Sequence, residues 1–222
     1  MSLEKRTLKS GDGFEFSAWF LPADGEKKGN LVLVQEIFGV NKYMKEAMAR
    51  FAAEGFDVIA PSMFDRQAMD FATDTHTDQD IANGGGYARA NGLEPAMMDI
   101  AACVGHMGGK ACITGFCYGG SMAYFAACNI PGIQAASCYY GSLLSAAKDT
   151  PPKAPTIAHF GRLDPHIPME GVAEFVGARD DVPVYVYDEA GHGFARQGTE
   201  DHHAQGDALA FQRTLDLFNS VL

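Results

Sequence analysis

The chain has few of the features that mark membrane or nucleic-acid-binding proteins. It has 17 lysines and arginines against 28 aspartates and glutamates, a net charge of −11, which argues against nucleic acid or an anionic membrane as a partner. No stretch approaches the ~18 consecutive apolar residues of a membrane-spanning helix. Residues 1–7 lack the apolar core of a signal peptide. We therefore expect a cytoplasmic protein with no membrane or nucleic-acid partner.

Cysteine usage excludes further classes. The five cysteines are odd in number, stand in apolar surroundings and include no C-x-x-C pair. This pattern disfavours a disulfide framework, a thioredoxin-like motif and a zinc knuckle. His202 and His203 stand together at the start of a predicted helix, but no matching cluster of ligands stands near them. We expect these two rings to be solvated, and we expect neither a metal nor another cofactor.

What is present is an alternation of strands and helices. The length of 222 residues suits one domain over residues 1–222, which we expect to be a monomer. Residues 3–8 and 14–21 alternate around a turn, as antiparallel strands do. Further strands are predicted at 30–34, 56–60, 111–114, 133–139, 155–160 and 182–187, with helices at 42–54, 93–107, 120–129, 168–178 and 201–221. The pattern predicts a doubly wound, mostly parallel α/β sheet with antiparallel N-terminal strands and helices on both faces.

Residues 62–92 fit this alternation least. They are rich in Asp, Thr, Asn and Gly, and the run Gly84-Gly85-Gly86 is expected to interrupt any long helix. Only a short helix near residues 77–82 is predicted. In this architecture the segment would lie near the mouth of a site. A mobile surface loop and a lid are both open interpretations.

The stretch with the clearest chemical meaning is Gly115-Phe116-Cys117-Tyr118-Gly119. It follows an apolar strand and leads into a helix, which is typical of the nucleophile elbow of α/β-hydrolases, with cysteine in place of serine. Glycines are needed at its two ends because side chains would collide in so sharp a turn. The competing interpretation is a buried structural cysteine beside a glycine-rich turn.

Asp164 and His192 complete a possible triad. With Cys117 they follow the chain order nucleophile, acid, histidine, and each comes just past the carboxyl end of a predicted strand. A neutral His192 could take the thiol proton while Asp164 holds the ring in the correct tautomer. Alternatively, Asp164 before Pro165 is only a turn former and His192 only a loop residue. His166 is the second choice for the base.

Backbone and charged groups near these residues are also candidates. The N–H groups of Ile37 and Tyr118 are expected to hold the oxyanion, because residues after the first parallel strand and after the nucleophile supply these donors in this fold. Glu36 is either a surface carboxylate or a charge that contacts the thiol or an arginine of the site. Arg196, four residues past His192, could be that arginine and could bind a substrate carboxylate bidentately.

Four stretches of the chain carry a resemblance to a known family: Gln35-Glu36-Ile37-Phe38-Gly39-Val40-Asn41, Gly115-Phe116-Cys117-Tyr118-Gly119-Gly120, Asp164 near His166-Ile167-Pro168, and Ala190-Gly191-His192-Gly193-Phe194-Ala195-Arg196. In these stretches the chain resembles the dienelactone hydrolase family (carboxymethylenebutenolidase-like) of the α/β-hydrolase superfamily. The resemblance implies a Cys117–Asp164–His192 triad that opens an unsaturated lactone through an acyl-enzyme. It implies that Glu36 contacts the nucleophile and changes partner when substrate binds, and that Arg196 holds the substrate carboxylate.

The chain departs from this family within residues 66–92. Relatives that act on dienelactone carry a second arginine there, shortly before a tyrosine. Here Tyr87 follows the three glycines, Arg89 comes after it, and Arg66 stands well before it. The expected substrate is therefore a small ester or lactone, anionic or not, and acceptance of dienelactone stays open. The alternatives are a non-catalytic small-ligand binding protein of the same fold and a thiol redox sensor at Cys117.

Overall fold

The computed structural model describes residues 2–222; Met1, which the one-domain prediction includes, lies outside them. Within this part of the chain, eight strands form one sheet in the order β1-β2-β4-β3-β5-β6-β7-β8. Strands β1, β2 and β4 pair antiparallel, whereas every neighbouring pair from β4 to β8 is parallel. This confirms the predicted sheet. The strands are β1 (Glu4–Lys9), β2 (Glu15–Leu21), β3 (Gly29–Val34), β4 (Phe56–Pro61), β5 (Ala111–Phe116), β6 (Ile133–Tyr139), β7 (Thr156–Gly161) and β8 (Val184–Tyr187).

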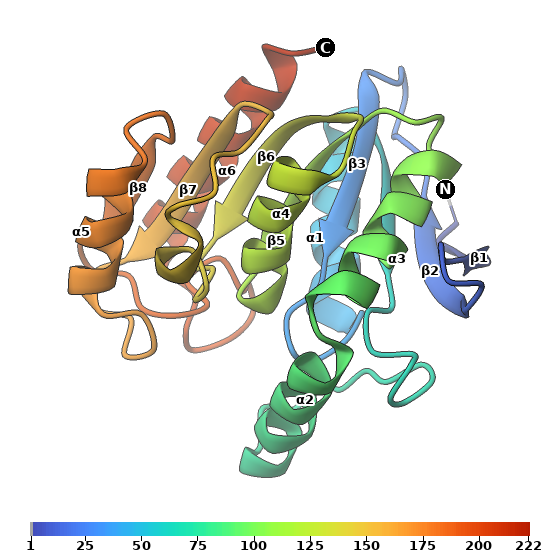
Figure 1. The fold of residues 1–222 in the computed structure, drawn as a ribbon, viewed down its shortest axis with the longest axis horizontal. Coiled ribbons are helices and arrows are strands. Elements are labelled where there is room, and N and C mark those ends of the chain that lie inside the picture. The colour runs from blue at the N-terminus through green and yellow to red at the C-terminus, as the bar shows by residue number, and fades with distance from the viewer. Residues whose placement is uncertain (1) are drawn as a thin grey trace.

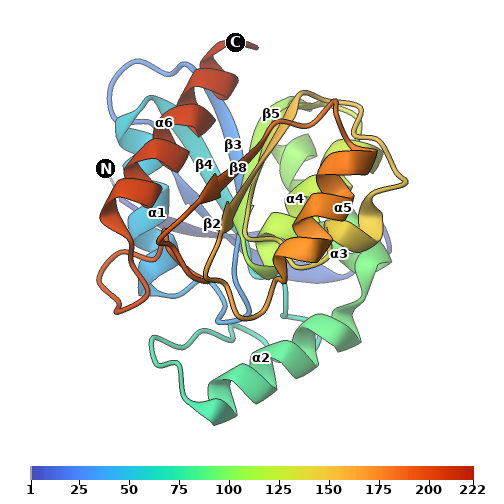
Figure 2. The ribbon, with the colours of Figure 1, turned by 90° about the vertical axis from the view of Figure 1, so that its left-hand side faces the viewer.

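Helices cover both faces of the sheet (Figure 1). Helices α1 (Lys42–Ala53) and α6 (Ala204–Asn219) lie on one face, and α3 (Leu93–His106), α4 (Tyr118–Asn129) and α5 (Met169–Ala178) lie on the other, as Figure 2 shows edge-on. A single 3-10 turn, η1 (Ser145–Ala147), follows β6. Because both faces are covered, the central strand β5 is buried along its whole length. None of the described helices has the length and apolarity needed to span a membrane.

The segment before α3 differs from its prediction. Residues Asp78–Asn91 form one continuous helix, α2, which runs through the three glycines. The expected interruption at Gly84 was wrong. Thr77 starts the helix with a capping box, in which its hydroxyl accepts from the Asp80 N–H and the Asp80 carboxylate accepts from the Thr77 N–H. A cap of this kind contributes about 1 kcal/mol, which offsets part of the low helix propensity of glycine.

Glycine is needed at position 84 for close packing rather than for a turn. It is buried, and a Cβ at this position would overlap the carbonyl oxygen of Ile37. The glycine therefore allows α2 to approach the segment that follows β3. The rest of α2 extends away from the body, below the carboxyl ends of the parallel strands (Figure 1, Figure 2).

The start of the last helix also differs from its prediction. Helix α6 begins at Ala204 rather than at residue 201, because the His203 ring caps it by accepting from the Gly206 N–H. His202 lies 3.2 Å from the Asp207 carboxylate and is partly buried. The expectation that both rings are solvated was wrong, since each ring has a protein partner.

Candidate active site

Cys117 sits on a sharp turn between β5 and α4. Its backbone has φ 55° and ψ −115°, a left-handed conformation that costs energy in any residue other than glycine. The turn is held because the Cys117 N–H donates to Tyr139 and the Cys117 carbonyl accepts from Ser121, at 3.0 and 3.2 Å. A Cβ on Gly115 would overlap the backbone of Gly119. The geometry is that of a nucleophile elbow.

The five thiols differ in their surroundings. Cys103, Cys112, Cys128 and Cys138 are buried, whereas Cys117 is partly exposed. Burial raises the pKa of all four buried thiols, to about 12 for Cys112 and about 11 for Cys128. A thiol attacks as thiolate, so these four are poor nucleophiles. Cys117 instead stands at the N-terminus of α4, whose dipole favours a negative charge.

His192 lies beside Asp164 and lines a hollow that Cys117 also lines. Its Nδ1 is 2.7 Å from Oδ2 of Asp164, whose side chain is fully buried. Burial lowers the pKa of His192, but hydrogen bonds to Asp164 and Cys117, with the negative charge of each, outweigh burial and raise this pKa to about 10. Because Nδ1 is bound to Asp164, Nε2 is the ring nitrogen left for the thiol.

Asp164 serves the turn and the ring at the same time. Its Oδ1 accepts from the backbone N–H groups of His166 and Ile167, at 2.8 and 3.2 Å, while Oδ2 holds His192. Asp164 is therefore a turn former that also contacts His192, and its role in a triad stays a prediction. The ring of His166 stands edge-on to His192 at 5.1 Å, and the ring of Tyr140 does so at 5.0 Å. His192, rather than His166, has the ring contact with Asp164.

The two amides expected to hold an oxyanion are available. In the part of the chain that the structure covers, neither the Ile37 N–H nor the Tyr118 N–H donates a hydrogen bond. Ile37 follows β3 and Tyr118 opens α4, and both residues line the same hollow as Cys117. Such uncommitted amides beside a nucleophile suit a developing negative charge.

Glu36 and Arg196 form a buried ion pair. Arg196 donates from Nε and Nη2 to the two oxygens of Glu36 at 2.9 Å each, and from Nη1 to Asp201 at 2.7 Å. Only 1% of Glu36 and 5% of Arg196 is exposed. Burial lowers the pKa of Arg196, but the Glu36 charge raises it above its already high ordinary value. The carboxylate of Glu36 thus binds an arginine of the site rather than Cys117.

Two hollows meet at the elbow. Ile37, Cys117 and Ser142 line both. One, of about 580 Å³, lies toward α2, α3 and α4 and is called the apolar hollow here. The other, of about 760 Å³, contains His192 and Arg196 and is called the polar hollow. Both volumes lie in the range of small-molecule sites.

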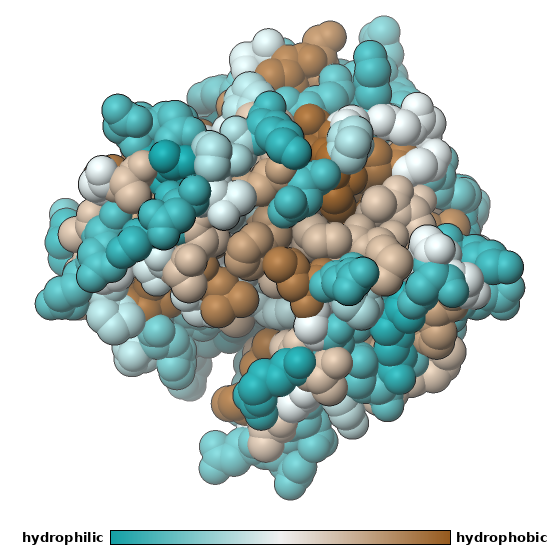
Figure 3. All heavy atoms as spheres, in the orientation of Figure 1, coloured by the Kyte–Doolittle hydropathy of each residue, from teal (hydrophilic) through white to brown (hydrophobic). Residues whose placement is uncertain are grey.

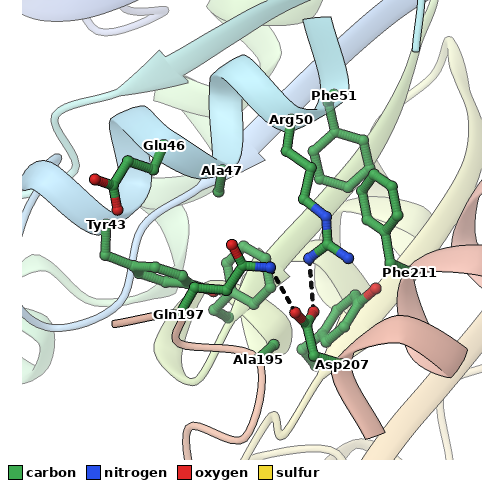
Figure 4. Close-up of a pocket in the computed structure, with 11 residues that line it drawn as sticks. Tyr43, Glu46, Ala47, Arg50, Phe51, Ala195, Gln197, Asp207 and Phe211 are labelled. Atoms are coloured by element: carbon green, nitrogen blue, oxygen red, sulfur yellow. Dashed lines mark hydrogen bonds and ion pairs between the residues drawn. The ribbon is translucent and has the colours of Figure 1, made fainter. Parts of the chain in front are cut away.

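A much smaller cavity is lined mainly by residues of α1 and α6 (Figure 4). Its volume is about 20 Å³, room for roughly one water molecule. At its edge the Asp207 carboxylate accepts from Arg50 of α1 and from Gln197, at 2.7 Å each. These contacts tie the loop that carries His192 and Arg196 to the helices α1 and α6. The cavity is part of the scaffold rather than a binding site.

Sequence reasoning missed Asp201 and the residues of α2 that line the apolar hollow. Asp201 is one of several acidic residues in its segment, and nothing in its spacing marks it as a partner of Arg196. Gly85 and Ala88 look like ordinary residues in the sequence, so only the placement of α2 brings them near Cys117. Helix α2 has a low hydropathy and contains three consecutive glycines, so the sequence pattern does not predict it.

Comparisons with known proteins agree on one family. The model of the dienelactone hydrolase family matches residues 16–222. A carboxymethylenebutenolidase of Pseudomonas putida and one of Pseudomonas knackmussii are each 30% identical to the chain over 227 residues, and cover 97% of it and 96% of their own length.

Solved structures share the fold. A Klebsiella pneumoniae protein provisionally assigned as a dienelactone hydrolase has a TM-score of 0.82 at 24% identity, and covers 98% of this chain and 99% of its own. A dienelactone hydrolase-like promiscuous phosphotriesterase from metagenomic libraries has a TM-score of 0.74 at 21% identity, with 100% and 99% covered. Together with the sheet and its helices, this confirms the α/β-hydrolase fold.

Proposed function

The chain belongs to the dienelactone hydrolase family, and on that premise we propose that it cleaves a lactone or carboxylic ester through an acyl-enzyme on Cys117. Family membership makes it an ester or lactone hydrolase by class. The observation that carries the mechanism is the position of His192, whose Nδ1 is 2.7 Å from Oδ2 of Asp164 and whose ring lines the same hollow as Cys117. This is the arrangement of a nucleophile, a base and an orienting acid.

The reaction proceeds in two halves. The Cys117 thiol gives its proton to Nε2 of His192, and the thiolate attacks the carbonyl carbon. The carbonyl oxygen becomes an oxyanion between the N–H groups of Ile37 and Tyr118. His192 then returns its proton to the leaving alkoxide, which leaves a thioester. Water attacks the thioester as His192 takes a proton from it, and the acid departs as the thiol is restored.

The raised pKa of His192 suits both proton transfers. Hydrogen bonding and charge at Asp164 and Cys117 outweigh burial and raise the pKa of His192 to about 10. An imidazole with a raised pKa takes up the thiol proton readily and holds it until the alkoxide leaves.

Arg196 is the proposed group for a substrate carboxylate, and Glu36 the group that adjusts the nucleophile. Arg196 lines the polar hollow together with His192. Because Glu36 and Asp201 together accept from all three of its nitrogens, a substrate carboxylate competes with one of these two carboxylates for Arg196. Glu36, once released, would carry an uncompensated charge beside the elbow, and that charge would act on the thiol.

The mechanism is tested with a panel of aryl esters and lactones. Wild type should turn them over, Cys117→Ala should lose turnover, and Cys128→Ala should keep it, because burial raises the pKa of that thiol. A slowly cleaved ester should add its acyl mass to Cys117, as intact-protein mass spectrometry measures. Full esterase activity in Cys117→Ala would refute the mechanism. Saturable binding without turnover in wild type would favour a non-catalytic binding protein.

A further inference from the structure

Exposed apolar side chains gather around the elbow. Eight large hydrophobic residues are exposed in the described chain, and four of them line the two hollows at Cys117: Ile81, Leu93, Leu143 and Leu163. In a space-filling view the surface is notched where α2 leaves the body, and apolar residues border the notch (Figure 3). Apolar surface concentrated at one place on a soluble protein marks a binding site.

The two hollows differ in chemistry. The apolar hollow is lined by Ala88 of α2, Leu93 of α3, Met122 and Phe125 of α4, and Leu143, with Arg89 as its one charged lining residue. The polar hollow also has apolar lining, at Phe38, Ile81 and Leu163, but it adds His76, His166, Glu189, Glu200 and Asp201 to the proposed catalytic histidine. A ligand that spans Cys117 therefore meets an almost wholly apolar wall on one side and a wall with many charged groups on the other.

The position of His192 decides which part of an ester enters which hollow. His192 lines the polar hollow and must reach the leaving oxygen to protonate it. The alcohol portion therefore lies on the polar side. The acyl chain, attached to the same carbonyl carbon, then points toward the apolar hollow.

We propose that the substrates are esters with an extended apolar acyl group, held in the apolar hollow, and a small or polar alcohol. This inference rests on the proposed function. In the thioester, the acyl chain bound to Cys117 occupies the apolar hollow. A volume of about 580 Å³ is far more than a small unsaturated lactone fills, so length of the acyl chain, rather than ring strain, becomes the feature that the site selects.

Chain length gives the first test. Burying one methylene group changes a binding constant about fourfold, so kcat/KM should rise by up to that factor per added methylene from acetyl to octanoyl until the hollow is filled. The sharper comparison is between two isomers, methyl octanoate and heptyl acetate, followed by pH-stat titration. We expect methyl octanoate to be preferred at least tenfold. Equal rates, or preference for heptyl acetate, would overturn the assignment.

A matched pair of variants on α2 gives the second test. Ala88 lines the apolar hollow, whereas Ala90 on the same helix is exposed and outside both hollows. Ala88→Phe should lower the ratio of kcat/KM for methyl octanoate to kcat/KM for methyl acetate at least tenfold. Ala90→Phe should leave this ratio unchanged. Circular dichroism and thermal unfolding show whether both variants fold.

The outcomes separate this inference from the proposed function. Cys117-dependent turnover with unchanged acyl preference in Ala88→Phe would overturn the acyl assignment and leave the hydrolase mechanism standing. Absence of Cys117-dependent turnover across all esters would overturn the mechanism. Calorimetric titration with octanoate then shows whether the apolar hollow binds the acyl chain. Equal affinity for octanoate in wild type and Ala88→Phe would show that the chain does not bind there.

Discussion

The guanidinium of Arg196 meets the carboxylate of Glu36 through two parallel hydrogen bonds of 2.9 Å, deep in the protein. Asp201 takes the third nitrogen at 2.7 Å. The cluster thus holds two negative charges and one positive charge. A substrate carboxylate must replace a carboxylate that is already bound, rather than find an open cation.

Asp201 is the easier of the two carboxylates to replace. About half of its side chain is exposed, whereas that of Glu36 is buried. Asp201→Ala should therefore strengthen binding of anionic esters, lowering KM about two- to fivefold, the scale of one partly exposed ion pair. Neutral esters should be unaffected. The measurement is KM for anionic and neutral esters of equal size.

Glu200→Gln is the matched control for charge, since Glu200 lines the same hollow. It removes the same charge from the same rim while the three hydrogen bonds of Arg196 stay in place. If both variants change KM equally, anion binding depends on the net charge around the hollow. It then does not depend on the Arg196 nitrogen that Asp201 leaves free.

The same pair makes Arg196 important for stability. Arg196→Met leaves Glu36 buried without its partner, which should lower the free energy of unfolding by about 3–5 kcal/mol. Glu36→Leu combined with Arg196→Met should recover much of that loss, because an apolar pair needs no compensation. Urea unfolding measures both. If Arg196→Met has the same free energy of unfolding as wild type, then Arg196 does not stabilise the fold by compensating the charge of Glu36.

The raised pKa of His192 predicts a pH dependence of stability. Its folded value of about 10 exceeds the ordinary 6.5. Protonated His192 thus stabilises the fold fully below about pH 6.5, and this contribution is lost as pH rises through about 10. The unfolding free energies of wild type and His192→Gln should converge between these values.

Imidazole NMR gives a direct check on the origin of this shift. The pKa of His192 should fall in Cys117→Ala and fall further in Asp164→Asn, because each removes a hydrogen-bonded negative partner. A His192 ring that titrates near 6.5 in wild type would show that these two partners do not stabilise the imidazolium.

Two glycines of α2 should respond in opposite ways to alanine. Gly84→Ala places a methyl group against the Ile37 carbonyl, so we expect a displaced α2, a shifted Ile37 amide and a kcat reduced about tenfold. Gly86 has open space around it. Gly86→Ala should stabilise the helix by about 0.5–1 kcal/mol through lower backbone entropy. Unfolding curves and steady-state kinetics test both, and equal behaviour would contradict the close-packing role of Gly84.

The sequence predicted the elements whose causes are local. Apolar runs such as residues 133–139 specified buried strands, and the elbow glycines specified a turn around Cys117. It did not predict α2, because the contact that explains Gly84 lies with Ile37, in a different part of the chain. The sequence also could not identify Arg196 as the partner of Glu36, because the two residues are 160 positions apart in the chain. The catalytic roles of these residues stay predictions.

The elbow has a consequence for how the chemistry can change. Backbone contacts, and not the thiol, force residue 117 into its left-handed conformation: a Cβ on Gly119 would overlap the Val34 carbonyl and one on Gly120 the Tyr139 carbonyl. A serine at 117 would meet the same backbone constraints. A single substitution at residue 117 could therefore change which side chain is the nucleophile. No single substitution could move the nucleophile to another position. In the course of evolution, reactivity at this site could vary without any change of shape.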